Sequence, residues 1–151
     1  MDIQDFTSDT WDLGRYPNIS WHEVSCSKTD LCRVDVDFLD FVQQMRTDLG
    51  FPLNFSSIYR HPTHPIEARK VADGRLPGSH AMGCAVDIKC SGMIARQILC
   101  WCTLYYDTFI LSGIGVSQKG AGRFVHLDAM NEDQCNSLGI GDNWATRLWT
   151  Y

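Results

Sequence analysis

The run Gly78-Ser79-His80-Ala81-Met82-Gly83-Cys84-Ala85-Val86-Asp87-Ile88 is the most informative part of the chain. It places a histidine and an aspartate seven residues apart, with small residues between them. Cys84 to Lys89 is predicted to form a short strand. Successive side chains of a strand point to opposite faces, so Val86 and Ile88 can face a core while Asp87 points into a cleft. The small Gly83 and Ala85 are expected to leave room there for a metal ion and its bound water.

A second histidine lies in Phe124-Val125-His126-Leu127-Asp128, within a strand predicted over Arg123 to Leu127. If this strand neighbours the first one, His126 meets Asp87. Two imidazoles and one carboxylate fill three corners of a tetrahedron around zinc and leave the fourth for water, as in catalytic zinc sites. The sequence therefore predicts a Zn²⁺ site made by His80, Asp87 and His126, and hydrolysis as its chemistry.

The remaining patterns predict an α+β fold, with a small antiparallel sheet and flanking helices in a single domain over residues 1–151. A helix is expected over Asp35 to Leu49, stopped by Gly50, and then a strand over Leu53 to Ile58 that delivers Arg60. A loop is expected from His61 to Gly78, with a helical turn near Ile66 to Val71. A helix capped by Ser91 and running to about Tyr106 and a strand over Phe109 to Val116 are also expected. Trp144 to Tyr151 is expected to cover a core edge.

Composition favours an ordinary soluble domain, with 44% hydrophobic and 21% charged residues. The net charge of −5 disfavours nucleic acid as a partner, because phosphate binding depends on clustered cations. The first residues lack a basic segment followed by an apolar one, and no stretch is apolar enough to span a membrane. We therefore expect a protein made in the cytoplasm, without a signal peptide or membrane insertion, and monomeric.

Seven cysteines in such a chain are expected to be mostly reduced thiols that pack as small hydrophobic residues. Cys26 and Cys32 are close enough in sequence to pair or to bind metal. No second close pair completes a zinc spacing, because Cys100 and Cys102 lie two apart on a predicted helix and point to different sides.

Taken together, the motifs resemble a known family. His80, Gly83, Ala85 and Asp87 match His-x-x-Gly-x-Ala-x-Asp, with Ser79 directly before His80, and this pattern is similar to that of the zinc D-Ala-D-Ala carboxypeptidases and L-alanyl-D-glutamate endopeptidases. The segments 57–60 (Ser-Ile-Tyr-Arg), 124–128 and 149–151 also resemble this family. The resemblance runs from about residue 20 to residue 151, and it implies a hedgehog-like zinc peptidase fold.

The resemblance also implies roles. His80, Asp87 and His126 would hold the zinc, and Arg60 would bind a substrate carboxylate or the negative charge of the tetrahedral intermediate. Ser79 could hydrogen-bond to substrate or simply form a turn. The zinc would lower the pKa of its bound water and polarise the scissile carbonyl while a carboxylate accepts the proton.

The identity of that carboxylate is open. Several branches of the family carry an acid three residues before the last ligand, where this chain has Arg123. Asp128 is the candidate, and it is equally suited to orienting a ligand histidine. Glu132 and Asp133 are more distant options.

Other residues are weaker candidates. They are His22, His61 and His64 as ligands or cleft residues, and Tyr59 and Trp149 as contacts for peptide or glycan, with solvent or core positions as the ordinary alternatives.

The expected function is hydrolysis of an amide bond in the peptide stem of bacterial peptidoglycan. The short chain resembles a bacteriophage endolysin that reaches the wall after release by a holin-type partner. The alternatives are a zinc-binding recognition module, as in the related hedgehog domains, and a virion structural component. The sequence does not decide which bond is cut or whether cleavage is internal or terminal.

Overall fold

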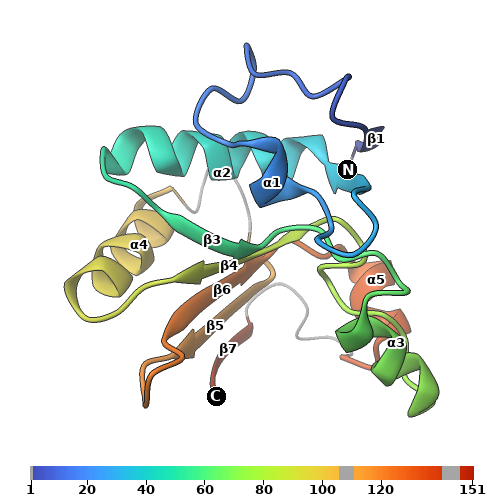
Figure 1. The fold of residues 1–151 in the computed structure, drawn as a ribbon. Coiled ribbons are helices and arrows are strands. Elements are labelled where there is room, and N and C mark those ends of the chain that lie inside the picture. The colour runs from blue at the N-terminus through green and yellow to red at the C-terminus, as the bar shows by residue number, and fades with distance from the viewer. Residues whose placement is uncertain (1, 106–110, 141–146) are drawn as a thin grey trace.

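The computed structural model describes residues 2–105, 111–140 and 147–151. Its helices and strands are β1 (Ile3–Phe6), α1 (Trp21–Val24), β2 (Cys32–Asp35), α2 (Val36–Leu49), β3 (Asn54–Ser57), α3 (Pro65–Ala72), β4 (Ala85–Lys89), α4 (Met93–Leu104), β5 (Gly113–Ser117), β6 (Phe124–Asp128), α5 (Glu132–Ser137) and β7 (Arg147–Thr150). Figure 1 shows α2 lying along one face of the main sheet, with α3 and α5 beyond one end of the strands.

The main sheet has the strand order β3-β4-β6-β5-β7. Its first four strands are antiparallel to their neighbours, whereas β7 runs parallel to β5. A separate antiparallel pair joins β1 and β2. The predicted α+β class is confirmed, but the expectation of an antiparallel sheet is wrong at the β7 edge, because the last strand returns beside β5 through a long connection.

Helix α2 forms as the periodicity predicts. Phe38, Leu39 and Met45 are fully buried along one stripe. The Asp35 side chain accepts the N–H of Asp37 at the start of the helix, and Gly50 ends it with a left-handed φ of 65°. This helix packs on the sheet face that holds the core.

That core face is built by alternation along β4 and β6. Val86, Ile88, Val125 and Leu127 are all fully buried in the main hydrophobic cluster together with α2 and α4. The residues between them therefore point to the opposite face of the sheet, which α2 does not cover (Figure 1). This second face carries the candidate site.

The boundaries of α4 differ from the prediction. Ser91 does not cap the helix: Gly92 occupies the N-cap with a φ of 55° and no side-chain hydrogen bond. The helix ends at Leu104, and Tyr106 lies outside the described residues. The strand expected over Phe109 to Val116 is β5, which begins only at Gly113; residues 109 and 110 also lie outside the described part.

Near the centre of the chain the predictions are close. The strand expected over Leu53 to Ile58 is β3, and the helical turn expected near Ile66 to Val71 is the eight-residue helix α3. Pro65 at its first position is pre-set for a helix, and His64 Nδ1 accepts the N–H of Ile66.

Five short elements were not predicted: β1, α1, β2, α5 and β7. Apolar periodicity is weak in segments of four to six residues, so local sequence carries little information about them. Of the segment expected to cover a core edge, Trp144 lies outside the described residues. Trp149 lies in β7 and Tyr151 follows it, so both extend the sheet rather than cover a core edge.

All seven cysteines are free thiols, and five of them are buried. Burial raises the pKa of Cys32 to about 12 and that of Cys102 to about 12. Within the described residues, no helix has the length and apolar character needed to cross a membrane.

Candidate metal centre

The strand register brings two of the predicted ligands together. In the antiparallel pairing of β4 with β6, Asp87 lies directly opposite His126. Cross-strand partners of this kind have Cβ atoms about 5 Å apart, so the two side chains meet on the open face of the sheet. The predicted adjacency of these strands is confirmed.

His80 reaches the same point from the turn before β4. Its Nδ1 lies 2.8 Å from the carbonyl oxygen of Ile58, so Nδ1 carries the proton and donates it there. The Nε2 atom is then unprotonated and lies 3.1 Å from Asp87 Oδ2. This Nε2 is buried and has no hydrogen-bond partner among the described residues. A buried nitrogen lone pair aimed at a carboxylate suits a bound cation between them.

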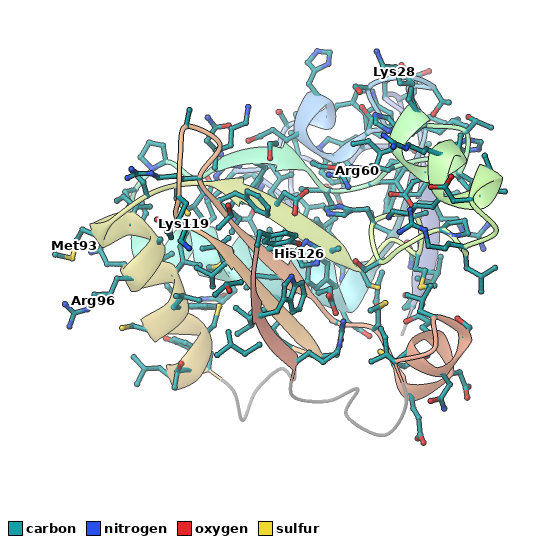
Figure 2. All side chains as sticks on the ribbon, turned by 90° about the horizontal axis from the view of Figure 1, so that it is seen from below. Lys28, Arg60, Met93, Arg96, Lys119 and His126 are labelled. Atoms are coloured by element: carbon teal, nitrogen blue, oxygen red, sulfur yellow. The ribbon has the colours of Figure 1, made fainter. Side chains whose placement is uncertain are left out.

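His126 presents its two nitrogens to two carboxylates. Nδ1 lies 2.8 Å from Asp87 Oδ1, and Nε2 lies 3.1 Å from Asp128 Oδ2. When Asp128 accepts the Nε2 proton, Nδ1 is the nitrogen left to bind a metal. Figure 2 shows the molecule from below relative to Figure 1, so it faces the side of the sheet that α2 does not cover. His126 lies in the middle of that face, with Arg60 nearby.

Burial and pairing shift the pKa values of these groups. Burial alone would raise the pKa of Asp87, but its close contacts with His126 and His80 outweigh this effect and hold the pKa well below its ordinary value. Burial lowers the pKa of His80, which favours the neutral imidazole that a metal requires. Burial would also lower the pKa of His126, but Asp128 and Asp87 outweigh it and raise this pKa.

The three side chains fit a metal ion. One ligand atom from each of His80, Asp87 and His126 lies within 4.8 Å of the others. Two imidazole nitrogens and one carboxylate oxygen form a donor set that zinc accepts, and three protein ligands leave a tetrahedral position open. Together with the unpartnered Nε2 of His80, this set supports a metal centre here. The metal's identity as zinc stays a prediction.

Asp128, the candidate proton acceptor, is 1% exposed and fully engaged. Its Oδ2 faces His126, while Oδ1 accepts from Ser112 Oγ at 2.7 Å and from Arg147 Nη2 at 2.6 Å. A carboxylate held by three donors is poorly suited to accept a further proton. The geometry favours the other role that the sequence left open, which is orienting His126.

Arg60 follows β3 and lies beside the ligands, as predicted. Its Nη2 is 2.5 Å from Asp87 Oδ2, and its Nη1 is 3.9 Å from Glu67 Oε1. Its backbone N–H donates to the carbonyl of His80, which fixes the turn that carries this ligand. Arg60 also lines a small pocket of about 220 Å³ that includes His22 and His64.

The other candidates lie at several places. Ser79 is half-buried in the turn, and its carbonyl accepts the N–H of Cys84. The Ser79 hydroxyl makes no hydrogen bond within the described chain, so its substrate role stays a prediction. Tyr59 is buried in the main core. Glu132 and Asp133 are exposed in the first turn of α5.

Gly83 has a different role from the one expected. Its φ is 78°, and a Cβ there would overlap the carbonyl oxygen of Arg33 and the Cα of Val34. The glycine thus lets β2 approach the turn, and its carbonyl accepts the N–H of Asp35. We find a packing requirement here rather than space for the metal.

Sequence reasoning missed Glu67, which is completely buried in α3. It accepts the N–H of Gly78 at 2.8 Å and pairs with Lys70 at 2.9 Å, so it fastens α3 to the turn that carries His80. In the sequence it appears as an ordinary acidic residue in the first turn of a helix. No local feature indicates its burial.

Sequence reasoning also missed the way in which β7 borders the site. Trp149 lies across β5, with its ring centroid 5.5 Å from that of His126. A Cβ on Gly115 would lie 2.7 Å from the Trp149 ring, and one on Gly113 would lie 2.8 Å from Arg147 Nη2. The Gly113-x-Gly115 spacing is the sequence feature that could have indicated this close approach.

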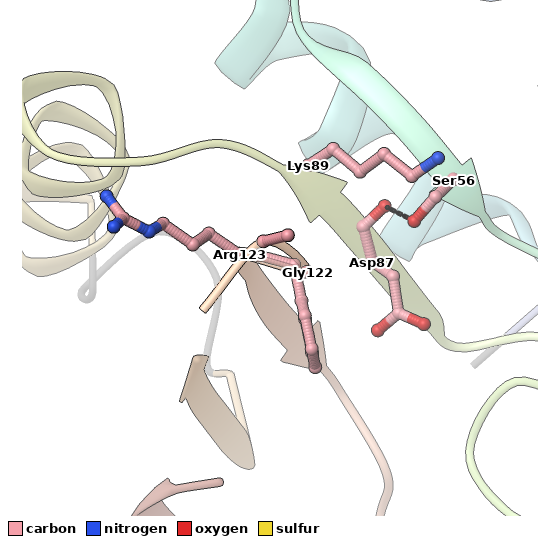
Figure 3. A pocket seen from close by; sticks show the side chains of 7 residues that line it. Ser56, Asp87, Lys89, Gly122 and Arg123 are labelled. Atoms are coloured by element: carbon pink, nitrogen blue, oxygen red, sulfur yellow. Dashed lines mark hydrogen bonds between the residues drawn. The ribbon is translucent and has the colours of Figure 1, made fainter. Parts of the chain in front are cut away.

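Asp87 lines a larger pocket of about 580 Å³, and Ser56 lines both this pocket and the smaller one that includes His22 and His64. Figure 3 shows Asp87 with Ser56, Lys89, Gly122 and Arg123 in this larger pocket. The larger pocket is therefore bordered by Asp87 and the smaller one by Arg60, its ion-pair partner.

Comparison with known proteins adds no assignment: no family model, curated protein or solved structure matches this chain.

Proposed function

We propose that this chain is a zinc-dependent peptidase that hydrolyses an amide bond in the peptide stem of bacterial peptidoglycan. The observation that carries the proposal is the buried group of His80, Asp87 and His126, with the free lone pair of His80 directed at Asp87. The sequence motifs around these residues resemble those of zinc wall peptidases. Geometry and motif thus indicate the same three ligands.

The surrounding residues have definable tasks in such a reaction. A zinc ion bound there would supply Lewis acidity toward the scissile carbonyl and toward water. The Ile58 carbonyl holds His80 in one tautomer, and Asp128 does the same for His126. Arg60, beside Asp87, places a permanent positive charge where negative charge develops on the substrate.

One feature favours a second candidate function, a zinc-binding recognition module. Among the described residues, the carboxylates around the site are already paired: Asp87 with Arg60, Asp128 with Arg147, and Glu67 with Lys70. A general base needs a carboxylate that is free to take a proton. Recognition without turnover requires no such group.

Digestion of purified peptidoglycan distinguishes the two candidates. The zinc-loaded protein should release new amino groups, and a chelator should stop the release until zinc is restored. The Asp87→Ala variant should keep the fold, checked by circular dichroism, and lose cleavage. Tight binding of the wall without release of amino groups would instead identify a recognition module.

If cleavage is found, mass analysis of products from a defined wall peptide identifies the bond. A phage-type lysis enzyme, released through a holin-type pore, remains our proposal for its biological setting. A virion component would instead be present in stoichiometric amount in phage particles.

A further inference from the structure

The larger pocket beside the metal centre contains one well-placed cation. Lys89 lies on β4 two residues after Asp87, and therefore on the same face of the strand. Both line the pocket of about 580 Å³, which we call the Lys89 pocket. Two strand residues span about 6.6 Å, so the backbone of Lys89 lies close to Asp87. In Figure 3 the Lys89 side chain extends toward Ser56.

The charge of Lys89 is unpaired within the described chain. Arg60 is paired with Asp87, and Arg147 with Asp128, at 2.5 and 2.6 Å. Lys89 makes no such contact with any residue that the structure describes. Arg123 also lines the pocket, but its side chain extends away from Asp87 in Figure 3, and its Nε donates to the Gly120 carbonyl.

An aromatic side chain lies beside Lys89 in the pocket lining. Phe124 is the cross-strand partner of Lys89, and its ring lies 4.9 Å from that of Tyr151. A cation facing an aromatic surface accommodates a ligand that has a carboxylate on a short aliphatic stem. Because the net charge of the chain is −5, a local cation such as Lys89 would offset the overall repulsion of such an anion.

We propose that the Lys89 pocket binds a carboxylate of the wall peptide, within about two residues of the bond to be cut. This inference rests on the proposed function. Asp87 and Lys89 are two strand residues apart, or about 6.6 Å. An extended peptide advances about 3.5 Å per residue, so about two of its residues cover the same distance. The carboxylate has two possible sources: a free carboxyl group inside the peptide, such as that of a γ-linked D-glutamate, or the peptide's C-terminus.

The test uses three synthetic wall peptides. One has both carboxylates free, one has the internal carboxylate converted to an amide, and one has the C-terminus amidated. Binding is measured on the full chain after chelation, and kcat/KM is measured with zinc. The variants are Lys89→Gln and, as a control of equal charge change outside the pocket, Lys119→Gln.

We expect the wild type to prefer the free carboxylate over one of the two amides by about three- to tenfold. The amide that causes the loss identifies the source. Lys89→Gln should remove the preference, and Lys119→Gln should retain it. The preference should also weaken as salt is raised, because the pocket is open to solvent.

The Lys89 assignment and the peptidase proposal can be rejected independently of each other. Turnover without any preference for a free carboxylate, or an equal loss in both lysine variants, would overturn the Lys89 assignment and leave the peptidase standing. A Lys89-dependent binding preference without turnover would support the pocket and reject the peptidase. Equal or absent binding of all three peptides would overturn the pocket.

Discussion

At the scale of single residues, Asp128 links the candidate metal centre to the rest of the fold. Its oxygens connect His126, Ser112 and Arg147, and it is almost completely buried. Burial would raise its pKa, but the His126 and Arg147 partners outweigh this and hold the pKa below its ordinary value. The side chain is thus an ionised anchor for His126.

The Asp128→Asn substitution should weaken zinc affinity about ten- to hundredfold, because it removes the negative charge that orients His126. Competition with a chromogenic zinc chelator measures this. Asp133→Asn, on the exposed surface of α5, is the control and should bind zinc like the wild type. Unchanged zinc affinity with abolished turnover in Asp128→Asn would show that Asp128 is the proton acceptor instead.

The sequence was sufficient to predict that His80, Asp87 and His126 lie together, but it was insufficient to predict which residues hold them in place. His80, Asp87 and His126 follow from strand alternation and short motifs, which are local properties. Arg147 meets Asp128 from 19 residues away, through a strand whose pairing no local pattern indicates. Glu67 was missed for the same reason, since its partner Gly78 lies across a loop.

At the scale of elements, β7 is the feature that changes the site most. It places Arg147 against Asp128 and Trp149 against His126. The Trp149 ring can lie there only if the neighbouring residue of β5 has no side chain. Gly115 on β5 is that residue. The strands β3 to β6 were predicted from their apolar patterns, whereas the four-residue β7 is too short for such a pattern to indicate it.

Gly115→Ala should destabilise the protein by about 1–3 kcal/mol, because the new methyl group would overlap the Trp149 ring. Urea unfolding followed by circular dichroism measures the change. Gly122→Ala is the matched control, since a Cβ there meets nothing within 4 Å. Equal stability of the two variants would contradict the pairing of β7 beside β5, which places the Trp149 ring against Gly115.

At the scale of the whole molecule, the fold keeps ionised carboxylates in buried positions. Glu67 is the example that is not itself a proposed metal ligand. Burial alone would raise its pKa, but the N–H of Gly78 and the ammonium group of Lys70 outweigh it and lower the pKa below 4.5. The unfolded chain then binds this proton more readily than the folded one, so acid favours unfolding.

Glu67→Gln should lower the free energy of unfolding at pH 7 by about 1–3 kcal/mol, since Lys70 loses its buried partner. The difference from wild type should persist above the ordinary glutamate pKa and shrink as the pH falls below about 4.5. Urea titrations of the metal-free chain between pH 7 and pH 3 measure it. A difference that does not vary with pH would show that the charge of Glu67 is unimportant.

The central claim is that His80, Asp87 and His126 form one metal site. Isothermal titration of the chelated chain with zinc tests it most directly. We predict one zinc per chain, with affinity reduced about a hundredfold or more in His80→Ala, Asp87→Asn and His126→Ala, and unchanged in His22→Ala, whose side chain is exposed. Absence of zinc binding by the wild type, or equal affinity in all four variants, would contradict the account.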